Sequence, residues 1–159
     1  MEFIELTATP DLFFDILPSD WRSGLEPHWD EYKESSKIYG LFDEGELVCG
    51  GVVFSKVTED TIFYEEIAEK WLKRGFLYIG YLYVVESRRG RGYGSRWLNE
   101  LFKIDPGQSY WLSIEEYELK DFYLRNGFQL VEGVEMKFFE QIAGEIWKEW
   151  ILVRDASQS

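Results

Sequence analysis

Residues 81–95 carry more information than any other part of this chain. They run Tyr81-Leu82-Tyr83-Val84-Val85-Glu86-Ser87-Arg88-Arg89-Gly90-Arg91-Gly92-Tyr93-Gly94-Ser95. The apolar, aromatic start predicts a buried strand, and a loop with alternating glycines and several arginines follows it. Trp97, Leu98, Leu101 and Phe102 then fall at helical spacing. The pattern predicts a strand, a Gly/Arg loop and a helix in direct succession.

This succession is suited to binding an anion. Glycines let the backbone turn tightly and approach a ligand closely. The N–H groups of a first helical turn point toward such a ligand, and the helix dipole favours negative charge there. Arginine adds paired donors that match phosphate oxygens. The loop therefore predicts a phosphate or diphosphate site.

Three kinds of glycine-rich loop compete for this interpretation. A P-loop ends in Gly-Lys-Ser/Thr, and no Gly-Lys pair occurs in the chain. A dinucleotide fingerprint needs Gly-x-Gly-x-x-Gly with an acid about 20 residues later. Gly90, Gly92 and Gly94 place the third glycine one residue early, although Glu115 and Glu116 stand roughly where the acid belongs. A dinucleotide fold also needs more β-α units than the rest of the chain offers.

The third kind of loop fits best. Arg89-Gly90-Arg91-Gly92-Tyr93-Gly94 resembles the Arg/Gln-x-x-Gly-x-Gly/Ala signature of the GNAT superfamily, the acetyl-CoA-dependent N-acetyltransferases. Upstream, Leu82-Tyr83-Val84 is similar to the family's hydrophobic strand. Downstream, Phe122-Tyr123-Leu124-Arg125-Asn126-Gly127-Phe128 resembles its Phe-Tyr-x-x-x-Gly-Phe segment. The resemblance is close over residues 78–131 and elsewhere rests on the order of the elements.

Length and composition set the frame for that resemblance. The 159 residues predict one domain, 1–159, with a core rich in its 7 Trp, 10 Tyr and 12 Phe. Cys49 lies in an apolar run and is interpreted as a small buried hydrophobe. The N-terminal residues lack the pattern of a signal peptide, and no run has transmembrane length. We expect a soluble, cytoplasmic protein with no membrane partner.

The net charge of −13 argues against a nucleic-acid partner, which needs basic surface. It is compatible with steering a cationic substrate, and equally with a purely solubilising surface. Arg88, Arg89, Arg91 and Arg96 oppose this overall field within nine residues. Such a basic cluster in an acidic chain again indicates an anionic ligand.

Periodicity and turn signals predict an α/β succession. We expect short helices at 12–17 and 28–35 with a loop at 18–27 between them, and a frayed tail at 155–159. We expect a hairpin of strands 37–43 and 46–57, a helix over 64–72 closed by Gly75, and a last strand pair turning at Ala143-Gly144. The other predicted strands are 2–7, 76–85 and 110–114, and the other helices are 95–103 and 116–125.

The GNAT resemblance implies how these elements assemble. It implies a mixed, twisted, mainly antiparallel sheet flanked by helices and splayed between strands four and five. The helix over 64–72 departs from the family's usual order, in which the third and fourth strands form a direct hairpin. Free backbone groups at the splay would receive the pantetheine arm of the cofactor.

The resemblance also implies residue roles. Acetyl-CoA serves as co-substrate, no metal is expected, and Tyr123 matches the tyrosine that protonates the departing thiolate. A main-chain N–H near Leu82 or Val84 would polarise the thioester carbonyl. The predicted cofactor-binding residues are Leu82, Val84, Arg89, Gly90, Arg91, Gly92, Tyr93, Gly94 and Ser95.

A general base is not evident. Where many family members carry a carboxylate, this chain has Tyr78, Ile79 and Gly80. Glu115 and Glu116 are the nearest acids, but a solvated helix start explains them as well. The only histidine, His28, is interpreted as a packed side chain.

The predicted acceptor segment combines aromatic and acidic residues that suit an ammonium group. A rim of the core would show the same composition. We predict transfer of an acetyl group to a primary amine by direct attack in a ternary complex. The alternatives are a silent acyl-CoA-binding module and a protein or peptide N-terminal acetyltransferase. A small cationic amine is the expected partner, and a homodimer stays open. The predicted acceptor-binding residues are Trp21, Glu26, Trp29 and Asp30.

Overall fold

The computed structural model of this chain describes residues 1–136 and 147–158. The fold divides into two compact units. The first unit comprises Met1–Lys56 and Ile79–Pro106, and the second comprises Val57–Tyr78 and Gly107–Ser159. Each unit is described separately below.

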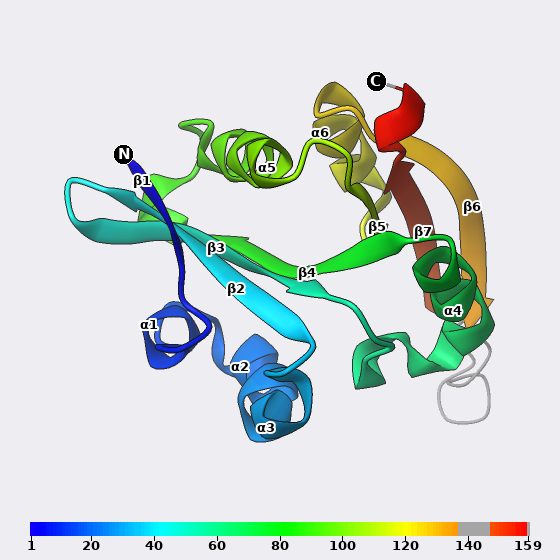
Figure 1. Cartoon of the computed structure of the whole chain (residues 1–159), viewed down its shortest axis with the longest axis horizontal. Helices are drawn as coiled ribbons and strands as arrows, with labels where there is room; N and C mark the ends of the chain where they lie inside the picture. The colour runs from blue at the N-terminus through cyan, green and yellow to red at the C-terminus, as the bar shows by residue number, and fades with distance from the viewer. Residues whose placement is uncertain (137–146, 159) are drawn as a thin grey trace. The chain divides into compact units, whose positions relative to one another are not determined.

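Within the described residues, seven strands follow the hydrogen-bonded order β1-β2-β3-β4-β5-β7-β6 (Figure 1). The pairing of β4 with β5 is parallel, whereas β1–β2, β2–β3, β5–β7 and β6–β7 are antiparallel. This is the predicted mixed, mainly antiparallel sheet. The strands are β1 (Glu2–Glu5), β2 (Ser36–Asp43), β3 (Glu46–Phe54), β4 (Phe76–Val84), β5 (Ser109–Ile114), β6 (Gln129–Met136) and β7 (Trp147–Arg154).

The first unit contains β1–β3 and the last part of β4. The predicted hairpin is confirmed, with Asp43 opposite Glu46 at its turn. Its helices are α1 (Asp11–Phe14), α2 (Ser19–Leu25), α3 (Trp29–Tyr32) and α5 (Tyr93–Ile104), with short 3-10 turns at Glu26–His28 and Glu86–Arg88.

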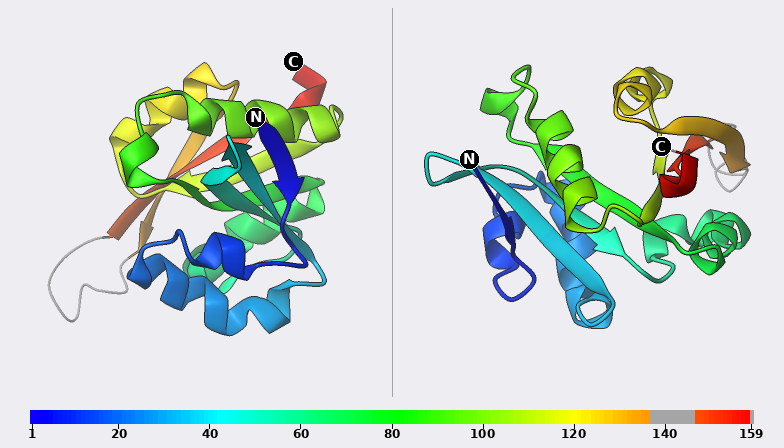
Figure 2. Two further views of the ribbon diagram at one scale, coloured as in Figure 1. Left: turned by 90° about the vertical axis from the view of Figure 1, so that its left-hand side faces the viewer. Right: turned by 45° about the horizontal axis from the view of Figure 1, so that its top comes forward.

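Two adjacent glycines let helices approach both faces of β3. A Cβ on Gly50 would lie 2.4 Å from the Phe13 ring of α1, and a Cβ on Gly51 would lie 2.7 Å from the Trp97 ring of α5. Neighbouring strand residues point to opposite faces. Accordingly, α1 lies on one side of these strands and α5 on the other (Figures 1 and 2). The Trp97 indole is fully buried and donates a hydrogen bond to the Tyr39 carbonyl at 2.9 Å.

The second unit is built around β5, β7 and β6, with the first three residues of β4 paired to β5. The segment between β3 and β4 contains a 3-10 stretch, η2 (Glu59–Tyr64), and α4 (Glu65–Lys73). The predicted helix over 64–72 is thereby confirmed, and Gly75 follows it. The unit also contains 3-10 turns at Tyr117–Leu119 and Ala156–Gln158, and α6 (Lys120–Arg125).

Two local predictions were wrong. Residues 18–27, expected to be a loop, contain α2. Proline is tolerated at the start of this helix because the missing N–H of Pro18 would have no partner within the helix. The Leu25 side chain, which is fully buried, anchors the other end. The tail, expected to fray, forms a 3-10 turn because Asp155 accepts a hydrogen bond from the Ser157 N–H at 3.0 Å. The predicted Ala143-Gly144 turn lies outside the described residues.

None of the helices in the described ranges combines the length and apolar character that crossing a membrane requires.

Candidate coenzyme A site and acid cluster

The loop before α5 is an open cradle of backbone donors. Gly90 and Gly92 have φ values of 79° and 81°, in the left-handed region that favours glycine, and a Cβ at either position would meet only open space. Gly92 is the N-cap of α5, and neither a side-chain cap nor an acidic residue occupies the first turn. The N-terminal N–H groups of this 12-residue helix therefore face the loop without a carboxylate to neutralise them.

Of the four arginines around the loop, Arg91 hydrogen-bonds the Tyr93 side chain, and the other three divide into two kinds. Arg88 forms an ion pair with Glu46, and Arg96 pairs with Glu100 at 3.1 Å. Arg89 instead extends along its own strand, where its Nε donates to the Val84 carbonyl at 3.1 Å. Its guanidinium also lies 5.2 Å from the centre of the Tyr83 ring. Since neither contact neutralises its charge, Arg89 keeps a full positive charge beside the cradle.

Tyr93 holds the cradle in place through its side chain. The ring is buried, and its hydroxyl donates a hydrogen bond to the Asp43 carboxylate in the β2–β3 turn. This hydrogen bond raises the pKa of the Tyr93 phenol. The side chain is thus committed to the fold, so that Tyr93, like Gly94, offers a ligand its main chain.

Strand β4 changes character at Tyr81. This residue has φ 58°, which is uncommon for a residue with a side chain and occurs only when the surroundings impose it. Tyr78, Ile79 and Gly80 are buried, but every residue from Tyr81 to Val84 is half-buried. The unusual φ at Tyr81 therefore coincides with the point where β4 changes from buried to half-buried residues, and Leu82 and Val84 lie in the half-buried part.

Backbone N–H groups, left-handed glycines and a charged arginine suit a diphosphate group. The predicted residues Arg89–Ser95 are consecutive in this loop and first turn, and Leu82 and Val84 lie on the strand that leads into it. The donor set of the loop therefore fits the diphosphate part of coenzyme A.

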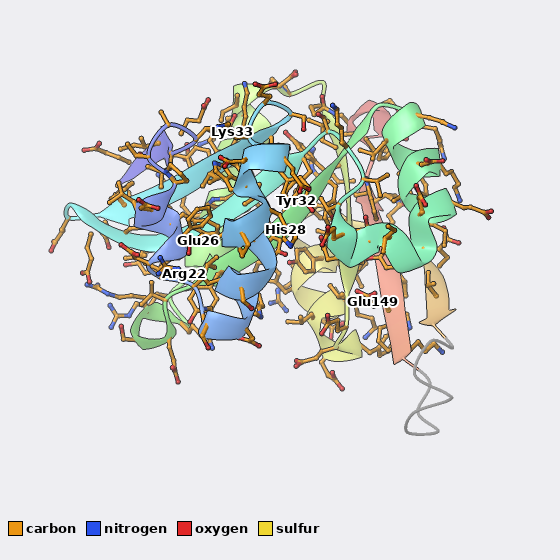
Figure 3. The ribbon with its side chains drawn as sticks, turned by 90° about the horizontal axis from the view of Figure 1, so that it is seen from below. Arg22, Glu26, His28, Tyr32, Lys33 and Glu149 are labelled. Atoms are coloured by element: carbon orange, nitrogen blue, oxygen red, sulfur yellow. The ribbon has the colours of Figure 1, made fainter. Side chains whose placement is uncertain are left out.

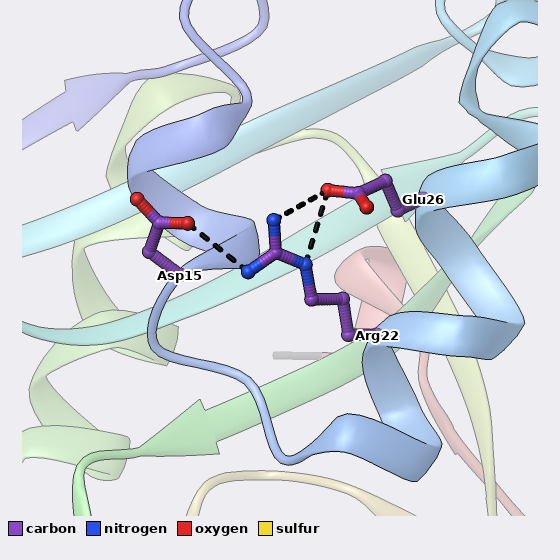
Figure 4. Close-up of polar contacts among 3 residues, drawn as sticks. All are labelled: Asp15, Arg22 and Glu26. Atoms are coloured by element: carbon purple, nitrogen blue, oxygen red, sulfur yellow. Dashed lines mark hydrogen bonds and ion pairs between the residues drawn. The ribbon is translucent and has the colours of Figure 1, made fainter.

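The predicted acceptor residues have unequal surroundings. Trp29 is buried and packs edge-on against Phe14 at 6.0 Å, and exposed Asp30 pairs with Lys33 at 3.2 Å. Glu26 accepts two hydrogen bonds from Arg22, at 2.8 and 3.1 Å, and Asp15 accepts a third, at 3.1 Å (Figure 4). Of the four predicted residues, Trp21 alone offers a large ring that is partly exposed.

Tyr123 lies on α6 in the second unit. Its ring contacts Phe122 and Phe128 at centroid distances of 4.9 and 5.6 Å. Its carbonyl accepts hydrogen bonds from the N–H groups of Asn126 and Phe128, both at 3.0 Å. The Phe-Tyr-x-x-x-Gly-Phe segment thus forms one packed turn at the end of α6.

The second unit also holds an acid cluster that the sequence interpretation missed. Glu149 on β7 is only 6% exposed, and Ser113 on β5 donates to its Oε1 at 3.4 Å (Figure 3). The Ser113 hydroxyl also bonds the Tyr64 hydroxyl at 2.7 Å, while Tyr78 donates to Asp60 at 2.9 Å. We call these five residues the acid cluster: Asp60, Tyr64, Tyr78, Ser113 and Glu149.

Glu149 is an acid that is buried near other acids. Among the described residues, no lysine, arginine or histidine forms an ion pair with it. Burial, together with the negative charges of Glu115 and Asp60, raises its pKa from 4.5 to about 7, against the opposing hydrogen bond from Ser113. One signal was visible in the sequence, since Glu149 shares a strand face with two apolar residues, Ile151 and Val153.

Comparison with known proteins agrees with this fold and loop. Residues 6–128 match the model of the Acetyltransferase (GNAT) family, and the chain belongs to that family. A search among curated proteins found no match.

Solved structures share the fold at low sequence identity. Aminoglycoside 6′-acetyltransferase type Ii has a TM-score of 0.67 at 16% identity, covering 98% of this chain and 97% of the other. A Bacillus subtilis acetyltransferase in complex with CoA has a TM-score of 0.66 at 18% identity, covering 97% of each chain. A putative streptothricin acetyltransferase from Bacillus anthracis str. Ames, in complex with acetyl coenzyme A, has a TM-score of 0.57 at 14% identity, covering 79% of this chain and 66% of the other.

These findings confirm the predicted fold and enzyme class: the protein is a GNAT acetyltransferase, and acetyl-CoA is its co-substrate. Cys49 is also confirmed as a buried hydrophobe, and burial raises the pKa of its thiol to about 12. A thiol with so high a pKa is not a nucleophile at neutral pH.

Proposed function

We propose that this protein transfers the acetyl group of acetyl-CoA to a primary amine of a small cationic molecule. The observation that carries the proposal is the open, left-handed loop at the start of α5, flanked by Arg89. Two of the solved structures with this fold are named as aminoglycoside acetyltransferases, and these names agree with a small amine as the acceptor.

The reaction is a direct transfer. The neutral amine attacks the thioester carbonyl carbon, a C–N bond forms, the C–S bond breaks and the electron pair leaves on the coenzyme sulfur. An N–H of Leu82 or Val84 stabilises the oxyanion, which is the usual role of a backbone donor in acyl transfer. Tyr123 gives its proton to the thiolate, and the amine loses a proton to solvent or to a base.

The first experiment measures release of free coenzyme A thiol from acetyl-CoA in the presence of a panel of amines. Amine-dependent thiol release with a matching N-acetyl product supports the proposal. Coenzyme A binding without turnover of any amine would instead identify a silent acyl-CoA-binding module. Turnover confined to peptides with a free N-terminus would identify a peptide N-terminal acetyltransferase.

The second experiment tests Tyr123. Tyr123→Phe removes the hydroxyl but keeps the ring contacts with Phe122 and Phe128. We expect kcat to fall by about 10²–10⁴, the usual contribution of a general acid, while coenzyme A affinity stays unchanged. Phe122→Leu, which alters the neighbouring ring and leaves the phenol, is the control. An unaltered kcat in Tyr123→Phe would show that the thiolate leaves without this proton donor.

A further inference from the structure

Three aromatic side chains of the first unit meet beside the coenzyme A loop. Trp21 of α2 contacts Tyr81 and Tyr83 of β4 edge-to-face, with ring centroids 6.2 and 5.6 Å apart. The Trp21 side chain stays 39% exposed, and both tyrosines are half-buried. We call Trp21, Tyr81 and Tyr83 the aromatic wall.

Two backbone features bring the wall together. The left-handed backbone at Tyr81 interrupts β4 where the tyrosines begin. On the facing helix α2, a Cβ at Gly24 would lie 3.2 Å from the Tyr81 hydroxyl, so the glycine leaves room for this oxygen. A strained residue and a close approach at the same place indicate that the position of Tyr81 is under constraint.

Asp15 and Glu26, two acids on the N-terminal helical segment that carries Trp21, are already engaged. Arg22 bridges Asp15 and Glu26, and Figure 4 shows its guanidinium between the two carboxylates. An ammonium group would have to compete with this arginine for either acid. Aromatic ring faces attract cations without a carboxylate. One ring of the wall already contacts a cation, because the Arg89 guanidinium lies 5.2 Å from the centre of the Tyr83 ring.

We propose that the aromatic wall binds a second ammonium group of the acceptor, so that the acceptor class is a diamine or polyamine. This inference rests on the proposed acetyl transfer. The amine that attacks the thioester has to be neutral, so it cannot be the cation that a ring face selects. The cation bound by the wall is therefore a different ammonium group on the same molecule. Arg89 of the coenzyme loop contacts Tyr83, and Tyr83 contacts Trp21, so the second ammonium group would bind next to the coenzyme loop.

The test compares two acceptors of equal length and shape. Diaminopentane carries the second ammonium group, and hexylamine replaces it with a methyl group. Trp21→Leu keeps an apolar side chain but removes the ring. We expect this variant to raise the KM for diaminopentane by about 2- to 30-fold, the range of one cation–π contact. The KM for hexylamine should change by less than about 2-fold, and Trp21→Phe should lie between Trp21→Leu and the unaltered protein.

Leu12→Ala is the control, because Leu12 is also an exposed apolar residue of the first unit, at 50%, and lies on another helix. It should leave both KM values unchanged. Equal losses for the two amines in Trp21→Leu would reduce the wall to an apolar contact and overturn the proposal. Unchanged KM values for both amines in Trp21→Leu would show that the acceptor does not contact the wall, and would also overturn the proposal.

A direct binding measurement separates this inference from the proposed function. If no amine is acetylated, the proposed function fails, and calorimetry of diaminopentane binding still tests the wall. Binding that weakens in both Trp21→Leu and Tyr83→Leu supports the wall. Binding that is absent, or that is insensitive to both changes, overturns it. Thermal unfolding and coenzyme A affinity of each variant show whether the fold is retained.

Discussion

The coenzyme loop of the first unit and the acid cluster of the second handle charge in opposite ways. Around the loop, Arg88 and Arg96 are matched by glutamates, and Arg89 stays charged in solvent. In the acid cluster, Glu149 is buried with hydroxyl groups and other acids, and no cation pairs with it within the described ranges 1–136 and 147–158. An exposed charge costs little free energy, whereas a buried unpaired charge is costly unless it takes up a proton. The loop is therefore suited to attracting an anion, and the cluster to holding a proton near neutral pH.

The largest effect is expected at the loop. Gly92→Val places a β-branched residue at φ 81° and fills the cradle. The backbone strain should lower stability by about 1–2 kcal/mol. The valine side chain blocks the approach of the diphosphate, so binding should weaken by at least about 100-fold, or about 2.7 kcal/mol. Gly75→Val is a matched control, because Gly75 has φ 87° and equally open surroundings in the second unit. Calorimetry with coenzyme A should show loss in Gly92→Val alone, and equal losses in both would point to general unfolding.

The next effect concerns Glu149 and pH. Its pKa in the folded protein is about 7, against 4.5 as the ordinary value. The folded state therefore binds more protons between these values, so this group's contribution to stability falls as pH rises from about 5 to 7 and is level above that. The difference between pH 5 and pH 8 should be roughly 3 kcal/mol at most, from 1.36 kcal/mol per pKa unit.

Denaturant unfolding of Glu149→Gln measures this contribution. The glutamine is neutral at every pH, so the pH dependence should flatten and the variant should exceed the unaltered protein in stability at pH 8. Glu132→Gln is the control, because Glu132 has a cationic partner, Lys70, at 3.3 Å. Because the pKa of Glu115 is also raised, a shallower slope can remain. A slope as steep as that of the unaltered protein would mean that Glu149 is not the group that takes up the proton.

A smaller effect should separate the arginines of the loop. Arg89→Ala removes a charge-assisted donor and should weaken coenzyme A binding by ~1.5–3 kcal/mol. Arg96→Ala removes a charge that Glu100 already engages, so its effect should be less than about 1 kcal/mol. Titration of both variants at one salt concentration gives the comparison. Equal losses would show that binding depends on the summed charge and not on the position of Arg89.

The smallest effect is expected for a hydroxyl of the acid cluster. Tyr64→Phe removes the hydrogen bond to Ser113 and should lower the free energy of unfolding by about 1 kcal/mol. Tyr117→Phe, an exposed tyrosine of the same unit, should change it by a few tenths of a kcal/mol. If the two substitutions are equivalent in urea unfolding, the Tyr64 hydroxyl contributes nothing beyond what water provides.

The sequence by itself determined the elements and the loop. Alternation and turn residues predicted the β2–β3 hairpin, and helical spacing predicted α4 and α5 within a few residues. The Gly/Arg loop was also legible, since left-handed backbone at Gly90 and Gly92 needs residues without a side chain. These features depend on neighbours along the chain, and for that reason a sequence pattern can express them. Helix α2 was missed because Pro18, Ser19 and Gly24 signal a turn locally, whereas burial of Leu25 stabilises the helix.

Only the tertiary structure decided how charges and rings are partnered. The sequence predicted Glu26 and Trp29 as acceptor-binding residues, with a rim of the core as the alternative. In the structure Glu26 is bonded to Arg22, and Trp29 packs on Phe14. The burial of Glu149 could not be predicted from the sequence, because the nearby hydroxyl groups, those of Ser113 and Tyr64, come from β5 and η2. The Trp21 contact with Tyr81 and Tyr83 likewise joins residues about 60 positions apart in the chain. Burial and long-range pairing set the pKa of a carboxylate and the exposure of a ring, and both arise from packing that no local pattern encodes.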